Sequence, residues 1–185
     1  MFPYRLDAEI TLDLLAPRHA QELYDVVDRN REQLRPWMPW VDTTRSVDDI
    51  KAFIATTLSQ VATDNGFHTA IRAHGRIVGI IGVHRIDWAN KSTSLGYWLA
   101  QDAQGKGIMT RACTAYIDYL FGELQLHRIE IHCATENLRS RAIPERLGFA
   151  SEGIARDAEW VNDRFVSHVV YSLLSSEWRR GSASS

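Results

Sequence analysis

The segment from Tyr97 to Thr110 constrains this chain most, because it joins an apolar strand end, a glycine-bearing loop and the start of a long amphipathic helix. The first backbone N–H groups of a helix lack intrahelical partners, and the helix dipole adds positive potential there. Such a corner binds phosphate; Gly105 and Gly107 would let a diphosphate approach the backbone, and Lys106 adds a positive charge. The segment therefore predicts a pyrophosphate-containing ligand, with an ordinary loop as the alternative.

The composition excludes several classes of function. A length of 185 residues predicts one domain, residues 1–185, with residues 175–185 as a flexible tail. A formal net charge of −2 and a pI near 6.4 argue against nucleic acid as a partner. The sequence shows neither a run of 18 apolar residues nor a signal peptide, so we expect a cytoplasmic protein without a membrane partner. Cys113 and Cys133 form no ligand pattern, and no metal is expected.

Hydrophobic periodicity predicts an α/β chain in which two helices precede the main sheet. Alternation with a period of two indicates strands at 9–15, 67–73, 76–84, 92–99, 129–133, 149–159 and 164–174. Apolar residues spaced three to four apart indicate helices over 20–27, 47–61, 109–121 and 137–147. The strand, helix, strand order around the glycine loop predicts one parallel pair.

Two local expectations concern proline and glycine. Gly79 and Gly82 weaken their strand and suggest a bulge or close packing. Pro144 lies inside the last expected helix and cannot donate its backbone N–H, so the Ser140 carbonyl should lose its helical partner and the helix should kink.

Three motifs together resemble a known family. The segment Gln104-Gly105-Lys106-Gly107-Ile108-Met109 is similar to the Q/R-x-x-G-x-G/A signature of the GNAT acetyltransferase superfamily, and Asn137–Ser140 with Glu145–Phe149 resembles its second cofactor-side element. Residues 107–110 and 141–146 resemble the RimJ/RimL branch, the N-terminal acetyltransferases of ribosomal proteins, most closely. Met109 stands where the signature has Gly or Ala, so its side chain must fit beside the cofactor or point into the core.

This resemblance implies a GNAT fold: a central mixed, mostly antiparallel sheet of about seven strands with one splayed parallel pair, and about four helices. It implies acetyl-CoA as the cofactor, with its pantetheine arm paired to the backbone of Tyr97, Trp98 and Leu99. One of these strand N–H groups would polarise the thioester carbonyl. The other implied cofactor residues are Gln104, Gly105, Lys106, Gly107, Ile108, Met109, Thr110 and Asn137. As alternatives, Tyr97 and Trp98 are ordinary strand residues and Asn137 only caps its helix.

The general acid is expected to depart from the usual family pattern. Many GNAT enzymes carry a tyrosine seven residues after the asparagine to protonate the departing thiolate, but Pro144 occupies that position here. Ser140 lies one helical turn after Asn137 and is the expected general acid. In the alternative, its hydroxyl only bonds to its own helix.

A carboxylate is expected to take a proton from the acceptor amine. An α-amino group has a pKa of about 8 and is partly neutral at cellular pH, so a weak base suffices. Glu159 is the first candidate, because the family places acceptor-facing residues late on the penultimate strand; Asp157, Glu136 and Asp87 are alternatives, and the acids could instead attract a cationic acceptor. Cys133 is not expected to carry a covalent acetyl group, since the amine can attack the thioester directly.

Aromatic side chains in loops are candidates for the acceptor site. Trp37, Trp40 and Trp88 would form a lid or groove wall, and the alternatives are packing or a contact in a homodimer. The resemblance to the RimL branch implies that the acceptor is the N-terminal α-amine of a ribosomal protein. A small amine (a polyamine, aminoglycoside or amino acid) is an alternative acceptor, and a non-catalytic sensor of coenzyme A is an alternative function.

Overall fold

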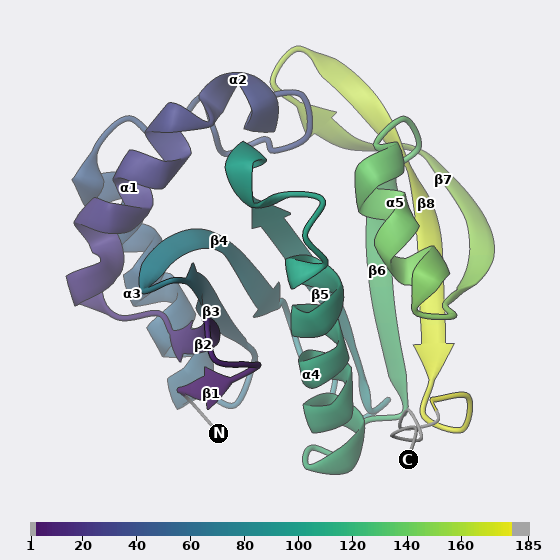
Figure 1. Ribbon diagram of the computed structural model, residues 1–185. Helices are drawn as coiled ribbons and strands as arrows, with labels where there is room; N and C mark the ends of the chain where they lie inside the picture. Colours follow the sequence, from purple (N-terminus) through teal and green to yellow (C-terminus); the bar gives the residue numbers. More distant parts are fainter. Residues whose placement is uncertain (1–2, 179–185) are drawn as a thin grey trace.

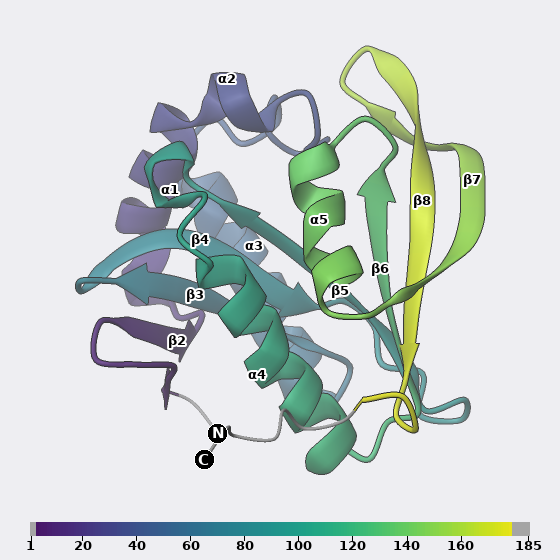
Figure 2. The same ribbon diagram turned by 45° about the vertical axis from the view of Figure 1, so that its right-hand side comes forward.

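The computed structural model describes residues 3–178, which form one twisted sheet with helices on both faces (Figure 1, Figure 2). The strands lie in the order β1-β2-β3-β4-β5-β6-β8-β7. They are β1 (Tyr4–Arg5), β2 (Ile10–Leu14), β3 (Phe67–Ala73), β4 (Arg76–Val83), β5 (Ser92–Leu99), β6 (Arg128–Ala134), β7 (Ala150–Val161) and β8 (Arg164–Leu174). The α-helices are α1 (Ala20–Arg29), α2 (Arg31–Leu34), α3 (Val47–Ala62), α4 (Ile108–Gly122) and α5 (Leu138–Arg146), with 3-10 turns η1 (Pro17–His19) and η2 (Gln101–Ala103).

The GNAT fold class expected from the sequence is confirmed. β5 and β6 form the parallel pair, and every other neighbouring pair in the described sheet is antiparallel. The sheet has eight strands where about seven were expected, because β1 is only two residues long and leaves no periodic pattern in the sequence. Helix α2 was also missed, because its four residues are too few to show a helical periodicity. The bulge expected near Gly79 is present, since the β3–β4 register shifts between Ile71 and Arg72.

The parallel pair separates halfway along its length. β5 pairs with β6 from Ser92–Arg128 to Leu95–Ile131 and no further, whereas its other edge stays paired with β4 as far as Leu99. Residues 96–99 of β5 therefore keep one edge without a strand partner, as the splayed pair of the expected fold requires.

Pro144 frees the Ser140 carbonyl of α5, as expected, and the kink stays a prediction. It lies inside the helix and has no N–H for the Ser140 carbonyl. The Tyr97 hydroxyl donates to that carbonyl instead, at 3.1 Å. A side chain from β5 thus satisfies a backbone group that proline leaves open on α5, and it joins the two sides of the splayed pair.

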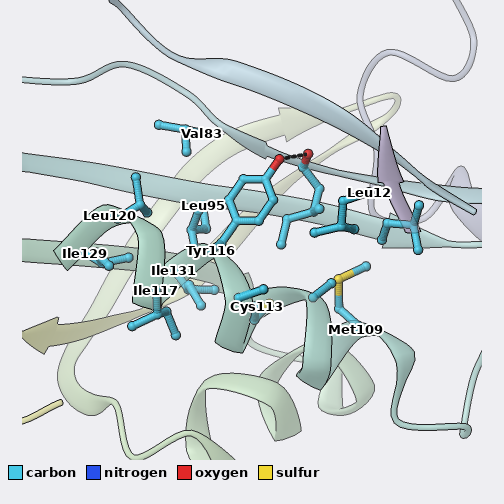
Figure 3. Close-up of a cluster of buried hydrophobic side chains, with 14 of the residues drawn as sticks. Leu12, Val83, Leu95, Met109, Cys113, Tyr116, Ile117, Leu120, Ile129 and Ile131 are labelled. Carbon is cyan, nitrogen blue, oxygen red and sulfur yellow. Dashed lines mark hydrogen bonds between the residues drawn. The ribbon is translucent and has the colours of Figure 1, made fainter. Parts of the chain in front are cut away.

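The helices cover the two faces of the sheet unequally. α1 packs on β4 and α3 on β3, and they enclose one core together with Trp98. The larger core lies between α4 and the opposite face (Figure 3). Met109 points into this core with 4% of its surface exposed, so its side chain packs in the protein interior.

The start of the expected C-terminal tail is packed against α4. Trp178 Nε1 donates to Asp118 Oδ1 at 2.8 Å, and the Trp178 side chain contacts the larger core. Residues 179–185 lie outside the described part of the chain. Among residues 3–178, no helix combines the length and the apolar character that a membrane crossing needs.

Tyr116 provides a test of the larger core. It is fully buried on α4 (Figure 3). Its hydroxyl lies 2.8 Å from Thr69 Oγ and donates to the Ile81 carbonyl at 3.0 Å. Replacing Tyr116 with Phe removes a buried hydroxyl from this network, and we expect the free energy of unfolding to fall by about 1–2 kcal/mol. Urea unfolding measures the change. Tyr119→Phe, on the same helix but only partly buried, should change it much less.

Candidate active site

The glycine loop forms an open anion-binding corner at the start of α4. Gly107 is the N-cap residue with φ of +69°, and Gly105 has φ of +73°. Both conformations disfavour any residue with a Cβ. A Cβ at either position would meet nothing within 4 Å, so the space above the loop is open. The backbone N–H groups of the first turn point toward that space without intrahelical partners, as a phosphate site requires.

A cavity of about 1000 Å³ extends from this corner along β5 and α5. Ten of the eleven cofactor residues expected from the resemblance line it: Tyr97, Trp98, Leu99, Gln104, Gly105, Gly107, Ile108, Met109, Thr110 and Asn137. Lys106 is exposed and does not line it. The side chains of Trp98, Leu99, Ile108 and Met109 are largely buried in the two cores, so these residues offer mainly their backbone to a ligand.

Arginine side chains supply the positive charge that Lys106 was expected to bring. Arg111, Arg139 and Arg146 line the same cavity. Arg139 donates to Gln104 Oε1 at 3.0 Å, and Arg146 donates to Thr110 Oγ1 at 3.0 Å. The sequence analysis missed these three residues, because only the packing of α5 beside the loop brings two of them there. Arg111 is paired with Asp7, whereas Arg139 and Arg146 have no carboxylate partner in the described part of the chain, so their charges suit a ligand with several phosphates.

A second cavity, of about 560 Å³, opens on the other side of the splayed strands. Six residues line both cavities: Trp37, Met38, Tyr97, Trp98, Asn137 and Ser140. Trp40 lines the second cavity as well, and its ring centroid lies 5.9 Å from that of Trp98. The structure does not bring Trp88 to either cavity. Its indole N–H donates to the Asp64 carbonyl at 2.7 Å, and the residue is 47% exposed.

Ser140 lies where the two cavities meet. Its backbone N–H donates to Asn137 Oδ1 at 3.2 Å, so Asn137 caps α5. Its hydroxyl oxygen is 3.3 Å from Cys133 Sγ. Cys133 is buried, and this burial raises the pKa of its thiol and keeps it protonated at neutral pH. The Ser140 hydroxyl can donate a proton here, and Cys133 is a poor nucleophile.

Glu159 is aimed at the second cavity by a bulge in β7. The β7–β8 register shifts between Ala155 and Glu159, and Asp157 within the shift has a positive φ of +46°. The Asp157 N–H donates to Ser167 Oγ at 3.0 Å, which holds the bulge. Bulges of this kind turn a side chain toward an active site. Glu159 lines the cavity, and its carboxylate lies 3.3 Å from His168 Nε2.

The other candidate carboxylates lie outside both cavities. Asp157 and Glu136 are exposed, and Glu136 lies 3.8 Å from the Arg164 guanidinium. Asp87 accepts from the Asn90 backbone N–H at 3.0 Å, and such bonds hold its pKa below the usual value. Asp87 therefore stabilises its own turn.

Four histidines, none of them expected from the sequence, line the second cavity: His68, His84, His132 and His168. They come from β3, the residue after β4, β6 and β8, and the strand order places them across one region of the sheet. Burial lowers the pKa of His68 to about 4, so its imidazole is neutral at physiological pH. Isolated histidines on separate strands show no spacing pattern, which explains why the sequence did not reveal them.

Two glycines allow a matched test of the phosphate corner. Gly107 and Gly75 both have positive φ, +69° and +78°, and at both a Cβ would meet open space. Alanine at either position should lower the free energy of unfolding by about 1 kcal/mol through backbone strain. Only Gly107→Ala places a methyl group in the predicted diphosphate site, so only it should raise the Kd for coenzyme A, by about tenfold. Calorimetric titration of both variants measures this. Equal affinities would contradict a diphosphate at Gly107.

Comparison with known proteins leads to the same family. Residues 9–150 match the family model described as "Acetyltransferase (GNAT) domain". The sequence is 38% identical over 179 residues, 96% of this chain and 98% of the relative, to the "Putative ribosomal N-acetyltransferase YdaF" of Bacillus subtilis. It is 27% identical over 170 residues, 92% of this chain and 95% of the relative, to the "Ribosomal-protein-serine acetyltransferase" of Escherichia coli.

A similar solved structure contains the expected acetyl donor. It is a microcin self-immunity acetyltransferase in complex with acetyl-CoA and AMP, and it superposes with a TM-score of 0.87 at 30% identity, covering 91% of this chain and 94% of the other. The glycine corner, the arginines and the free edge of β5 described above fit such a donor. This chain belongs to the GNAT family and is an acetyl-CoA-dependent acetyltransferase.

Proposed function

We propose that the protein transfers the acetyl group of acetyl-CoA directly to a primary amine, the N-terminal α-amine of a ribosomal protein being the leading acceptor. The observation that carries this proposal is the meeting of the two cavities at Tyr97 and Ser140. Donor and acceptor can enter from opposite sides and react without an acetyl-enzyme. The named relatives, both ribosomal-protein acetyltransferases by their printed names, support the choice of acceptor.

Two side chains would carry the chemistry. Glu159, across the second cavity, would attract the acceptor's ammonium group and take one proton from it, directly or through water. The amine nitrogen would then attack the thioester carbon while a backbone N–H of β5 stabilises the carbonyl oxygen. Ser140 would give its proton to the departing thiolate. The carbon–nitrogen bond forms, the carbon–sulfur bond breaks, and amide and coenzyme A leave by separate cavities.

A second class of acceptor, an amine that carries a nucleotide, is favoured by one specific observation. Trp37, Trp40 and Phe53 line the second cavity, and Phe53 is 37% exposed. Flat aromatic side chains of this kind suit stacking with a nucleobase. The solved acetyltransferase at 30% identity contains AMP beside acetyl-CoA.

An acceptor panel tests the proposed function. Thiol release from acetyl-CoA is measured with peptides that begin with Ser or Ala, a polyamine, an aminoglycoside, free amino acids and an aminoacyl nucleotide analogue. We expect the largest kcat/KM for a peptide. A larger value for the nucleotide-bearing amine would support the second class. Coenzyme A binding without thiol release for any amine would instead support a sensor.

Ser140→Ala tests the general acid. Without a proton donor for the thiolate, kcat should fall by about 100-fold, whereas the Kd for coenzyme A should stay within about twofold. Stopped assays and calorimetric titration measure the two quantities. Ser59→Ala, exposed on α3, is the matched control. An unchanged kcat would remove Ser140 from this role.

Cys133→Ala should keep most of the activity, because the proposed transfer forms no acetyl-enzyme. An inactive but folded Cys133→Ala variant would instead support a covalent route.

Glu159→Gln tests the base. The amide keeps the size of the side chain but cannot accept the ammonium proton, so kcat/KM for a peptide acceptor at pH 7 should fall by about 100-fold. The fall in kcat/KM should be smaller above pH 9, because an α-amine with a pKa of about 8 is already neutral there. Glu136→Gln, outside both cavities, is the control. An equal loss at pH 7 and pH 9.5 would show that Glu159 only orients the acceptor.

A further inference from the structure

The proposed acetyl transfer, on which this inference rests, removes two protons from the acceptor nitrogen. An ammonium group has three N–H bonds and the amide product has one, so two protons leave the nitrogen. Glu159 would take the first before the attack. The second must leave as the carbon–nitrogen bond forms, and at that moment Ser140 still carries the proton that it will give to the thiolate. A second base near the splayed strands would take this proton without calling on Ser140.

His84 is held at that place by β5. It follows the last residue of β4, and its backbone N–H donates to the Ser94 carbonyl at 3.0 Å. Its ring lies over Gly96, where a Cβ would come within 2.4 Å of Nε2. Gly96 is the first residue of β5 beyond the paired segment with β6 and directly precedes Tyr97. The missing side chain at Gly96 thus creates the space that brings the imidazole to the splay.

The hydrogen bonding of His84 differs from that of the other three histidines. His84 Nδ1 lies 3.0 Å from Ser94 Oγ, which can accept the Nδ1 proton and so leave the lone pair on Nε2. No described residue is a partner of that Nε2. By contrast, Nε2 of His132 contacts Glu130 at 2.7 Å, and Nε2 of His168 contacts Glu159 at 3.3 Å. His68 Nδ1 is buried without a partner, so no bond fixes its tautomer.

The charge environment keeps His84 ready to accept a proton. His84 is exposed, but contact of its ring with the cavity wall desolvates it in part and holds its pKa below the usual value, and His132 on β6 acts in the same direction. Glu159 on β7, while its carboxylate is charged, acts in the opposite direction. Neighbouring His68 on β3 is neutral at physiological pH, since its pKa is about 4. The lowered pKa favours the uncharged His84 imidazole at neutral pH.

We propose that His84 is a catalytic residue that accepts the second proton of the acceptor nitrogen on Nε2. The nitrogen lone pair forms the bond to the acetyl carbon, and the N–H electron pair stays on nitrogen as its proton passes to Nε2. The carbon–sulfur pair leaves on sulfur, which takes the Ser140 proton. His84 then returns its proton to the Ser140 oxygen, directly or through water. Only the proton on Glu159 is released, as the overall reaction requires.

His84→Asn is the sharpest test of this proposal. The Asn amide can still donate to Ser94 Oγ, so the local structure is kept, but it offers no base at the position of Nε2. With a peptide acceptor, kcat should fall by about 100-fold while the Kd for coenzyme A and the melting temperature stay near those of the unmodified protein. His74→Asn is the matched control, because His74 is an exposed turn residue that lines neither cavity.

Chemical rescue separates a base from a structural residue. In His84→Ala, added imidazole should enter the vacated space and raise kcat at least tenfold, with an effect that follows the neutral fraction of imidazole as pH is varied. A normal kcat in His84→Asn would overturn the proposal, as would a loss that imidazole does not restore in a folded His84→Ala. If the unmodified protein released no thiol with any amine, the proposed function itself would fail first.

Discussion

The early end of β5–β6 pairing is the constraint on which the rest of this structure depends. Beyond Leu95 and Ile131 the two strands no longer pair with each other, so one edge of β5 is left with unpaired backbone groups. An unpaired strand edge is an attachment point for any extended chain that carries amides. The pantetheine arm of coenzyme A is such a chain. Both cavities exist because this gap is not closed by further pairing.

The gap is held open by contacts on both of its sides. Trp98 is anchored in the core beneath α1 and α3, and Leu99 in the core beneath α4, so β5 cannot shift toward β6. Tyr97 spans the opening and bonds to α5 at the carbonyl that Pro144 leaves free. At the far end, Asn162 in the β7–β8 turn donates to the Arg35 carbonyl at 2.6 Å, and Figure 1 shows this hairpin beside the segment after α2. These contacts fix the width of the opening.

The sequence predicted the donor half of the molecule far better than the acceptor half. Strand alternation, the apolar face of α4 and the glycine loop are local sequence patterns. Each is present in the structure, because the residues that make the pattern are the same residues that pack there. Glu159 was proposed because the family places acceptor-facing residues late on the penultimate strand, yet the bulge that turns its side chain depends on Asp157 and Ser167, which contact each other only across β7 and β8. The position of Trp88 could not be predicted for the same reason, because its hydrogen-bond partner Asp64 lies 24 residues away in the sequence.

The donor half was easier to predict than the acceptor half for a physical reason that also bears on acceptor specificity. The donor would be held chiefly by backbone groups, which any sequence supplies once the strand, loop and helix have formed, so a short signature with two glycines suffices to predict its site. The acceptor cavity is built from side chains of β3, β4, β6, β7, β8 and the segment after α2. Many of these side chains, Glu159 among them, take no part in the contacts described above that hold the opening. On this proposal, acceptor specificity depends on the side chains around His84, Glu159 and Trp40 rather than on the glycine loop.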